Sequence, residues 1–197
     1  MSDGQAAMLA PESPPVRVPL PTPSPTLQGS RCSVRALTPA DAPSMARHAD
    51  DEGVWRNLFE GFPRPYLLSH AELWCGDEHR KPNYGHVWAI DVAGEAIGCC
   101  SLRPDSGWLR CNAEVGYWIG RSHWRLGITS EALMLISAWA WATLPELTRL
   151  YAPIFAWNAG SQAVARRAGY VHEATHPRSA IKAGQVIDRT IYAAYRH

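Results

Sequence analysis

The pattern of hydrophobic and polar residues along the chain predicts a series of short strands. Apolar and polar positions alternate over most of these segments, as in strands that bury one face. A turn at Ala93-Gly94-Glu95 is predicted to join two of them into a hairpin. The predicted strands cover residues 32–37, 86–92, 96–103, 113–119, 149–156, 170–176 and 186–195.

Helix start signals lie between these strands. Thr38 followed by Pro39 gives an N-cap with proline at the first helical position, and Ser69 is predicted to cap the next helix. Between those two helices, the run Phe62-Pro-Arg-Pro-Tyr66 predicts an irregular segment. The predicted helices cover residues 38–50, 69–77, 130–143 and 159–168.

The elements follow the order β-α-α-β-β-β-α-β-α-β-β. This order predicts the α/β class, with an α+β mixed sheet in a single domain. A chain of 197 residues with 46% hydrophobic residues has enough apolar surface for one core. The domain is predicted to cover residues 31–197.

Residues 1–30 differ from the rest in composition, because they contain seven of the sixteen prolines. Proline lacks the backbone donor that regular structure needs, so this Pro-rich N-terminal arm is predicted to be extended or disordered. The alternative is a segment that packs on the domain or on a partner.

The charge balance argues against polyanionic partners. The net charge is +1 and the chain has no run of Lys or Arg, which disfavours nucleic acid and anionic membrane surfaces. The apolar segments are too short or too interrupted to span a bilayer, and the first residues lack the pattern of an export signal. The five cysteines, an odd number, include Cys99-Cys100 on opposite faces of one strand, which favours reduced thiols and a cytoplasmic location.

The segment 114–133 is the most informative part of the chain. It is predicted to form a strand, a short turn around Gly127 and a helix whose first N–H groups are free. These groups and the helix dipole make a backbone anion site that suits a phosphate or pyrophosphate. Because the net charge is close to zero, phosphate recognition must be local. A second marker segment follows at 155–170.

Four motifs carry a resemblance to a known family. They are Val54-Trp-Arg-Asn-Leu58 with Gly61-Phe-Pro-Arg-Pro-Tyr66, Ala113-Glu-Val-Gly-Tyr-Trp-Ile-Gly120, Trp124 through Leu133, and Trp157-Asn-Ala-Gly-Ser161 with Arg167-Ala-Gly-Tyr170. In this order they resemble the GNAT acyltransferase superfamily, and more narrowly its RimJ/RimL-like N-acetyltransferase branch. The resemblance covers about residues 31–196.

Two residues depart from the loop pattern Gln/Arg-x-x-Gly-x-Gly/Ala of the family. Gly127 matches, but the branch usually has glycine at the position of Arg125 and alanine or glycine at that of Thr129. Glycine lets the backbone approach phosphates closely, so these bulkier residues weaken or re-aim the coenzyme, unless Arg125 adds a charge-assisted contact. We expect binding to be retained, because the backbone donors survive any side-chain change.

The resemblance implies acetyl-CoA as the co-substrate and no metal. In the family a bulge in the central strand presents backbone N–H groups to the acetyl carbonyl, which assigns that role to Tyr117, Trp118 and Ile119. The full set of implied coenzyme-binding residues is Tyr117, Trp118, Ile119, Trp124, Arg125, Leu126, Gly127, Ile128, Thr129, Ser130, Asn158 and Ser161.

Glu114 and Ser161 are the candidate catalytic residues. Glu114 is expected to share a strand face with Gly116 and Trp118, where partial desolvation favours a general base; the alternative is a solvated glutamate in an ordinary salt bridge. The family assigns Asn158 to the pantetheine arm and Ser161 to protonation of the thiolate. Both residue types are also ordinary at a helix start.

The acceptor side of the site is less specific in sequence. Trp55, Phe59, Phe62 and Tyr66 are candidates for the wall of an amine pocket, or are packing anchors of a loop. His172 and His176 do not predict a metal site, because this spacing on a strand separates them by roughly 13 Å.

These observations predict an N-acetyltransferase that moves an acetyl group directly from acetyl-CoA to a primary amine. The acceptor is a protein N-terminus or a small-molecule amine, and a homodimer is possible. The alternative is a non-catalytic acyl-CoA-binding or sensor module on the same fold, supported by Arg125 and Thr129. A nucleic-acid-binding role is disfavoured by the charge.

Overall fold

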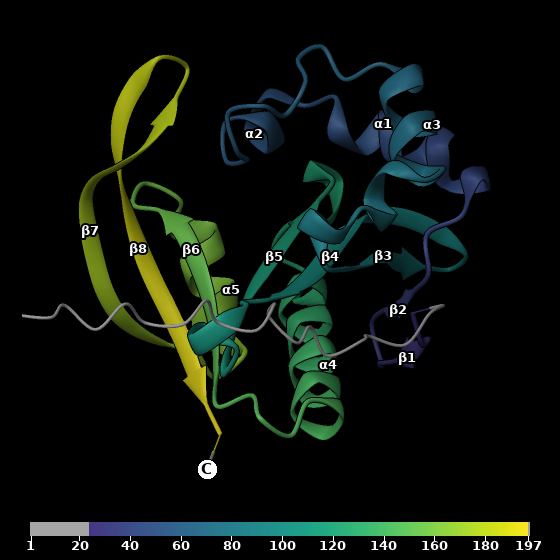
Figure 1. The fold of residues 1–197 in the computed structure, drawn as a ribbon. Helices are drawn as coiled ribbons and strands as arrows, with labels where there is room; N and C mark the ends of the chain where they lie inside the picture. The colour runs from purple at the N-terminus through teal and green to yellow at the C-terminus, as the bar shows by residue number, and fades with distance from the viewer. Residues whose placement is uncertain (1–23, 197) are drawn as a thin grey trace, which may run out of the picture.

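The computed structural model describes residues 24–196 as one eight-stranded sheet with helices on both faces (Figure 1). The strand order is β1-β2-β3-β4-β5-β6-β8-β7, and β5–β6 is the parallel pair in an otherwise antiparallel arrangement. The strands are β1 (Leu27–Gln28), β2 (Ser33–Arg35), β3 (His86–Val92), β4 (Glu95–Pro104), β5 (Asn112–Ile119), β6 (Arg149–Phe155), β7 (Val171–Lys182) and β8 (Gln185–Tyr195). The helices are α1 (Ala42–Ala49), α2 (Glu52–Trp55), α3 (Leu68–Cys75), α4 (Ile128–Thr143) and α5 (Ala159–Arg167).

The predicted α+β sheet and the order of its main elements are confirmed. Ala93 and Gly94 have φ values of 53° and 86°, so the turn between β3 and β4 has the left-handed backbone of a tight hairpin. The structure adds the short elements β1 and α2. None of the helices between residues 24 and 196 combines the length and apolarity that crossing a bilayer requires.

Two boundary predictions are wrong. Helix α3 begins at Leu68, so Ser69 lies inside it, and the Leu67 N–H donates to Nδ1 of His70 at 3.0 Å. Strand β7 does not end at residue 176 but continues past Pro177 to Lys182. Because β7 is an edge strand, a proline there can leave its missing N–H on the unpaired side.

Residues 24–30, which the composition assigned to the N-terminal arm, pack on the domain. Oγ of Ser24 lies 2.8 Å from Nδ1 of His86, and the Trp88 indole donates to the Pro25 carbonyl oxygen at 3.1 Å. Leu27 and Gln28 pair with β2. The prediction of an extended or disordered arm otherwise falls on residues 1–23, which lie outside the described part of the chain.

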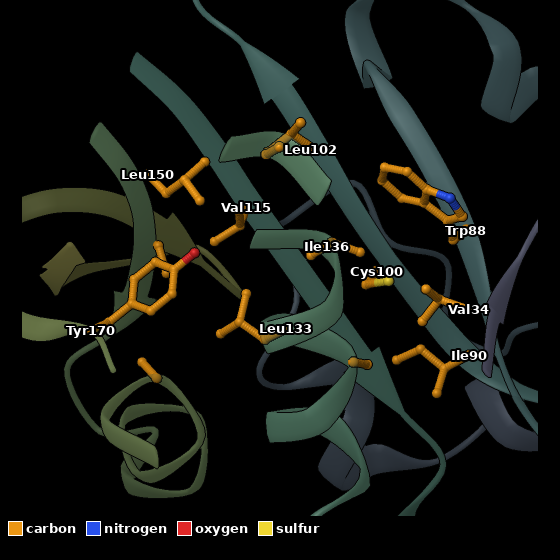
Figure 2. Packing of buried hydrophobic residues seen from close by; sticks show 14 of the residues in the cluster. Val34, Trp88, Ile90, Cys100, Leu102, Val115, Leu133, Ile136, Leu150 and Tyr170 are labelled. Atoms are coloured by element: carbon orange, nitrogen blue, oxygen red, sulfur yellow. The ribbon is translucent and has the colours of Figure 1, made fainter. Parts of the chain in front are cut away.

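The sheet separates two apolar layers. On one face, Leu133 and Ile136 of α4 pack against Cys100, Leu102 and Val115, as Figure 2 shows. On the other face, α1 and α3 cover a smaller cluster that includes Cys99. The neighbours Cys99 and Cys100 therefore point to opposite faces as predicted, and all five cysteines are free thiols.

The sheet opens between its two halves. Parallel pairing joins β5 and β6 through Asn112, Ala113 and Glu114 only. Beyond Glu114, β5 continues to Ile119 and β6 continues to Phe155 without pairing to each other. The edge of β5 that faces β6 is therefore free of a strand partner at the point where the chain leads into α4 (Figure 1).

Candidate active site

The turn between β5 and α4 holds two residues with left-handed backbone. Gly127 stands at the N-cap of α4 with a φ of 78°, and Arg125 has a φ of 65°. Glycine adopts this conformation freely, whereas a residue with a Cβ is strained in it. The backbone at Arg125 thus keeps a conformation suited to glycine. Arginine in place of the glycine usual in the family has not changed the conformation of the turn there.

The start of α4 provides the donors for an anion. The helix is sixteen residues long, so its dipole places partial positive charge at Ile128, Thr129 and Ser130. The first N–H groups of a helix have no partner within it. Oγ of Ser130 is also buried without a hydrogen-bond partner in residues 24–196. An anion with several oxygens, such as a pyrophosphate, fits these unpaired donors.

Trp124 holds the loop to the end of β5. Its indole N–H donates to the Ile119 carbonyl oxygen at 3.0 Å, while 39% of the residue stays exposed. A Cβ placed on Gly53 would lie 3.1 Å from the Trp124 ring, so α2 is in close contact with the same residue. Leu126, by contrast, is 55% exposed. Trp124 therefore fixes the loop to β5, whereas the Leu126 side chain is largely exposed.

Glu131, in the first turn of α4, binds the turn that precedes β2. Its carboxylate accepts hydrogen bonds from the backbone N–H groups of Ser30, Arg31 and Cys32 at 2.9, 2.6 and 3.1 Å, and from the Ser30 hydroxyl at 2.7 Å. Burial raises the pKa of this carboxyl, but the four hydrogen bonds outweigh burial and lower the pKa to about 2. The side chain is thus ionised and fully engaged at neutral pH.

Strand β5 shows no bulge. Its register with β4 is regular from Ala113 to Ile119, so the bulge expected from the family resemblance is wrong for this part of the chain. The free edge of β5 arises instead from the divergence of β5 and β6. Tyr117, Trp118 and Ile119 lie on this free segment, where their backbone is not paired to β6.

The Ser161 side chain lies at the opposite wall of this opening. Asn158 is the N-cap of α5, and its Oδ1 accepts from the Ser161 N–H at 3.0 Å. The Ser161 hydroxyl donates to the Tyr117 hydroxyl at 3.1 Å, and the Tyr117 hydroxyl donates to the Ser161 carbonyl oxygen at 3.0 Å. Burial raises the pKa of Tyr117 to about 12, so its proton stays in place at neutral pH. The Tyr117 side chain thus joins β5 to α5 across the opening.

Glu114 sits at the last residue of β5 that pairs with β6. Its Oε2 accepts from Nη2 of Arg103 at 2.5 Å, and Arg103 is the residue directly opposite it on β4. The pair is partly exposed, with side-chain exposures of 48% for Arg103 and 28% for Glu114. The salt bridge that sequence analysis gave as the alternative for Glu114 is therefore present, and a substrate ammonium would compete with Arg103 for this carboxylate.

Comparisons with known proteins agree with this geometry. The model of the family "Acetyltransferase (GNAT) domain" matches residues 31–171. The chain belongs to the GNAT acetyltransferase family. It is accordingly an acetyl-CoA-dependent acetyltransferase. Among curated proteins, none matches the sequence significantly.

Solved GNAT structures share the fold at low sequence identity. RimJ of Mycobacterium smegmatis in complex with CoA-disulfide is 21% identical, with a TM-score of 0.76 over 87% of this chain and 87% of that one. RimL, a ribosomal L7/L12 alpha-N-protein acetyltransferase in complex with coenzyme A, is 19% identical, with a TM-score of 0.74 over 87% and 98%. The microcin C7 self-immunity acetyltransferase MccE, in complex with acetyl-CoA and AMP, is 16% identical, with a TM-score of 0.74 over 85% and 94%.

The predicted acceptor-side aromatics of this GNAT domain come together. Phe62 stacks on Tyr66 with ring centroids 4.9 Å apart, and it meets Trp118 of β5 at 6.1 Å. Tyr66 is only 7% exposed and packs in the layer of α1 and α3, whereas Phe59 is 59% exposed. Tyr66 is therefore a packing anchor, and Phe62 with Trp118 is the aromatic pair nearest the free part of β5.

Trp55 is already engaged by the chain itself. Its indole N–H donates to the Phe62 carbonyl oxygen at 3.1 Å, and Nζ of Lys182 lies 3.8 Å from its ring centroid. Lys182 comes from the end of β7 and is 4% exposed. Nearby, the Trp157 indole donates to Oδ1 of Asn57 at 3.1 Å. The loop after α2 is thus tied both to the β7–β8 hairpin and to the start of α5.

Several residues of the site were missed in the sequence. Arg103 and Lys182 contact predicted site residues from other strands, and Arg31 approaches the loop from the turn before β2. Nothing local in the sequence indicated that the Tyr117 hydroxyl has a partner on α5. In residues 24–196, no cluster of His, Cys, Asp and Glu has the geometry to hold a metal ion.

Proposed function

We propose that this GNAT domain is an N-acetyltransferase that moves an acetyl group from acetyl-CoA directly to a primary amine. The observation that carries the proposal is the free edge of β5 beside the start of α4. The two features follow one another along one chain segment. The β5 edge offers unpaired donors to a thioester carbonyl, and the start of α4 offers unpaired donors to phosphates. Acetyl-CoA supplies the activated acetyl group.

Each chemical task has a residue on this frame. Backbone N–H groups of Tyr117 and Ile119 polarise the acetyl carbonyl, whereas the Trp118 N–H faces β4, as does that of Gly120, which donates to the Ile97 carbonyl oxygen. Asn158 retains amide donors for the pantetheine arm. Glu114 takes the proton of the incoming ammonium, once the ammonium has displaced Arg103. Ser161 donates a proton to the thiolate, supported by the Tyr117 hydroxyl.

The acceptor is proposed to be a protein N-terminus or a small-molecule amine. RimL is a ribosomal-protein Nα-acetyltransferase, whereas MccE is a self-immunity enzyme, so relatives with this fold are not confined to one kind of role. The Phe62–Trp118 pair supports an acceptor that places an apolar group beside its amine. The closed salt bridge between Glu114 and Arg103 favours the alternative, a binding or sensor module without turnover.

One experiment separates these two functions. Calorimetric titration with CoA and acetyl-CoA is followed by an amine screen that detects released thiol, using peptides with Ala, Ser and Met N-termini, polyamines and aminoglycosides. Coenzyme binding with turnover on at least one amine is expected. Binding without turnover on any of them favours the sensor, and loss of both rejects the proposal.

A further inference from the structure

The Arg31 side chain lies against the coenzyme loop. A Cβ placed on Gly127 would be 3.5 Å from Nε and 3.6 Å from Cδ of Arg31, so the Arg31 side chain lies beside the open side of Gly127. Arg31 is exposed, and no ion pair joins it to a described carboxylate. A guanidinium with unused donors therefore stands beside the residue that begins α4.

The backbone of Arg31 is fixed from the same helix. Glu131 accepts its N–H at 2.6 Å together with those of Ser30 and Cys32. A Cβ on Gly29 would lie 2.7 Å from Cδ of Glu131, so the turn can close around the carboxylate only with glycine there. The Glu131 carboxylate would repel an anion bound at the start of α4. Four hydrogen-bond donors already surround its charge, which reduces this repulsion.

We propose that Arg31 contacts a phosphate group of the coenzyme, and that Glu131 is the positioning residue that holds Arg31 beside Gly127. The inference rests on the coenzyme binding of the proposed function, but not on any acceptor. A guanidinium matches phosphate oxygens in a fork of two donors, and the chain has a net charge of only +1, so attraction must come from local cations. The 5′-diphosphate and the 3′-phosphate offer the same chemistry, and the ligand pair below distinguishes them.

The test of Arg31 compares CoA with 3′-dephospho-CoA. Both ligands are titrated into the wild type, into Arg31→Gln and into Arg110→Gln, a control for an exposed arginine that pairs with Glu146 away from the loop. Arg31→Gln is expected to weaken CoA binding about tenfold to a hundredfold, the usual range for a charge-assisted contact. Arg110→Gln is expected to leave the affinity for CoA unchanged. An equal loss for both ligands assigns the diphosphate, and a loss for CoA alone assigns the 3′-phosphate. Unchanged affinity for both overturns the proposal.

The test of Glu131 uses a ligand without phosphates. Gln at position 131 keeps one acceptor oxygen and cannot satisfy all four donors, so Glu131→Gln is expected to weaken CoA while leaving inhibition by pantetheine nearly unchanged. The double variant with Arg31→Gln is expected to bind CoA no more weakly than Arg31→Gln alone. Equal losses for CoA and pantetheine, or additive losses, overturn the positioning role. Tight CoA binding without turnover rejects the N-acetyltransferase proposal and leaves this inference standing.

Discussion

Tyr117 and Ser161 exchange two hydrogen bonds across the opening between β5 and α5. The serine hydroxyl donates to the phenol, and the phenol donates to the serine carbonyl oxygen. The pair therefore holds the Ser161 side chain and joins α5 to β5.

We expect Ser161→Ala to lower kcat by at most about a hundredfold, the low end for general acid catalysis, because a thiolate is a good leaving group. Tyr117→Phe keeps the ring and removes the hydroxyl, so it is expected to lower kcat less than Ser161→Ala does. The affinity for CoA, measured by titration, is expected to change little in both. An unchanged kcat in Ser161→Ala would remove the serine from this role.

Glu114 and Arg103 allow the base to be separated from the salt bridge. Glu114→Gln is expected to lower kcat about a hundredfold or more at neutral pH, with near-normal CoA affinity, if the carboxylate accepts the ammonium proton. Arg103→Gln breaks the same ion pair but keeps the carboxylate, so it is expected to retain most of the activity. The pair is partly exposed and contributes at most about 1 kcal/mol to stability. Similar small effects in both variants would show that Glu114 acts only in the salt bridge.

The sequence predicted the elements that carry the proposed coenzyme side because they are local. Strand β5, the turn at Gly127 and the start of α4 are consecutive, and their donors belong to the backbone. The partners of Glu114 and Tyr117 were not predictable in this way. Arg103 is placed by the register of β4 on β5, and Ser161 is placed by the packing of α5, so both contacts depend on the folded sheet.

The elements show the same division. Apolar runs and turn residues predicted β3, β4 and β5 closely; β3 and β4 are buried on both faces, and β5 alternates between buried and half-buried positions over most of its length. The end of β7 was missed because Pro177 reads as a stop. The proline is tolerated because β7 lies at the sheet edge and its pairing with β8 is irregular between His176 and Ala180. The short helix α2 has too few residues to leave a periodic signal.

Arg125 offers a test of strain in the coenzyme loop. Its φ of 65° is costly for a residue with a Cβ. Arg125→Gly relieves this strain but makes the unfolded chain more flexible, so we expect a net gain of up to about 1 kcal/mol in the free energy of unfolding. Arg125→Ala keeps the strain and is expected to give no gain. Urea unfolding of the wild type, Arg125→Gly and Arg125→Ala measures this gain. Equal stability of the two variants would contradict strain at position 125.

Gly120 and His48 form a tight contact at the end of β5. A Cβ on Gly120 would lie 2.3 Å from Nδ1 of His48, whose Nε2 is held 2.7 Å from Oε1 of Glu95. Gly120→Ala is therefore expected to lower the free energy of unfolding by roughly 1–3 kcal/mol, the usual cost of overpacking. Adding His48→Ala is expected to recover part of this loss in the double variant. A double variant that shows purely additive losses would contradict the contact.

His86 is expected to make the fold sensitive to acid. It is 7% exposed, packs against both Trp88 and Trp139, and its Nε2 has no hydrogen-bond partner among residues 24–196. Burial lowers its pKa from 6.5 to about 4. Between pH 6.5 and about pH 4, His86 of the unfolded chain binds a proton that His86 of the folded chain does not. This contribution to stability is therefore fully present above pH 6.5 and is lost as the pH falls toward about 4.

The pKa difference of His86 corresponds to a loss of about 3 kcal/mol over that interval. His86→Phe keeps an aromatic ring against the two tryptophans and removes the titration, so its free energy of unfolding is expected to fall less than that of the wild type between about pH 7 and about pH 4.5. Urea unfolding at both pH values measures this difference, and comparison within each protein cancels the intrinsic effect of the substitution. Since other buried groups titrate equally in both proteins, an identical fall in the two would show that His86 does not carry the acid sensitivity.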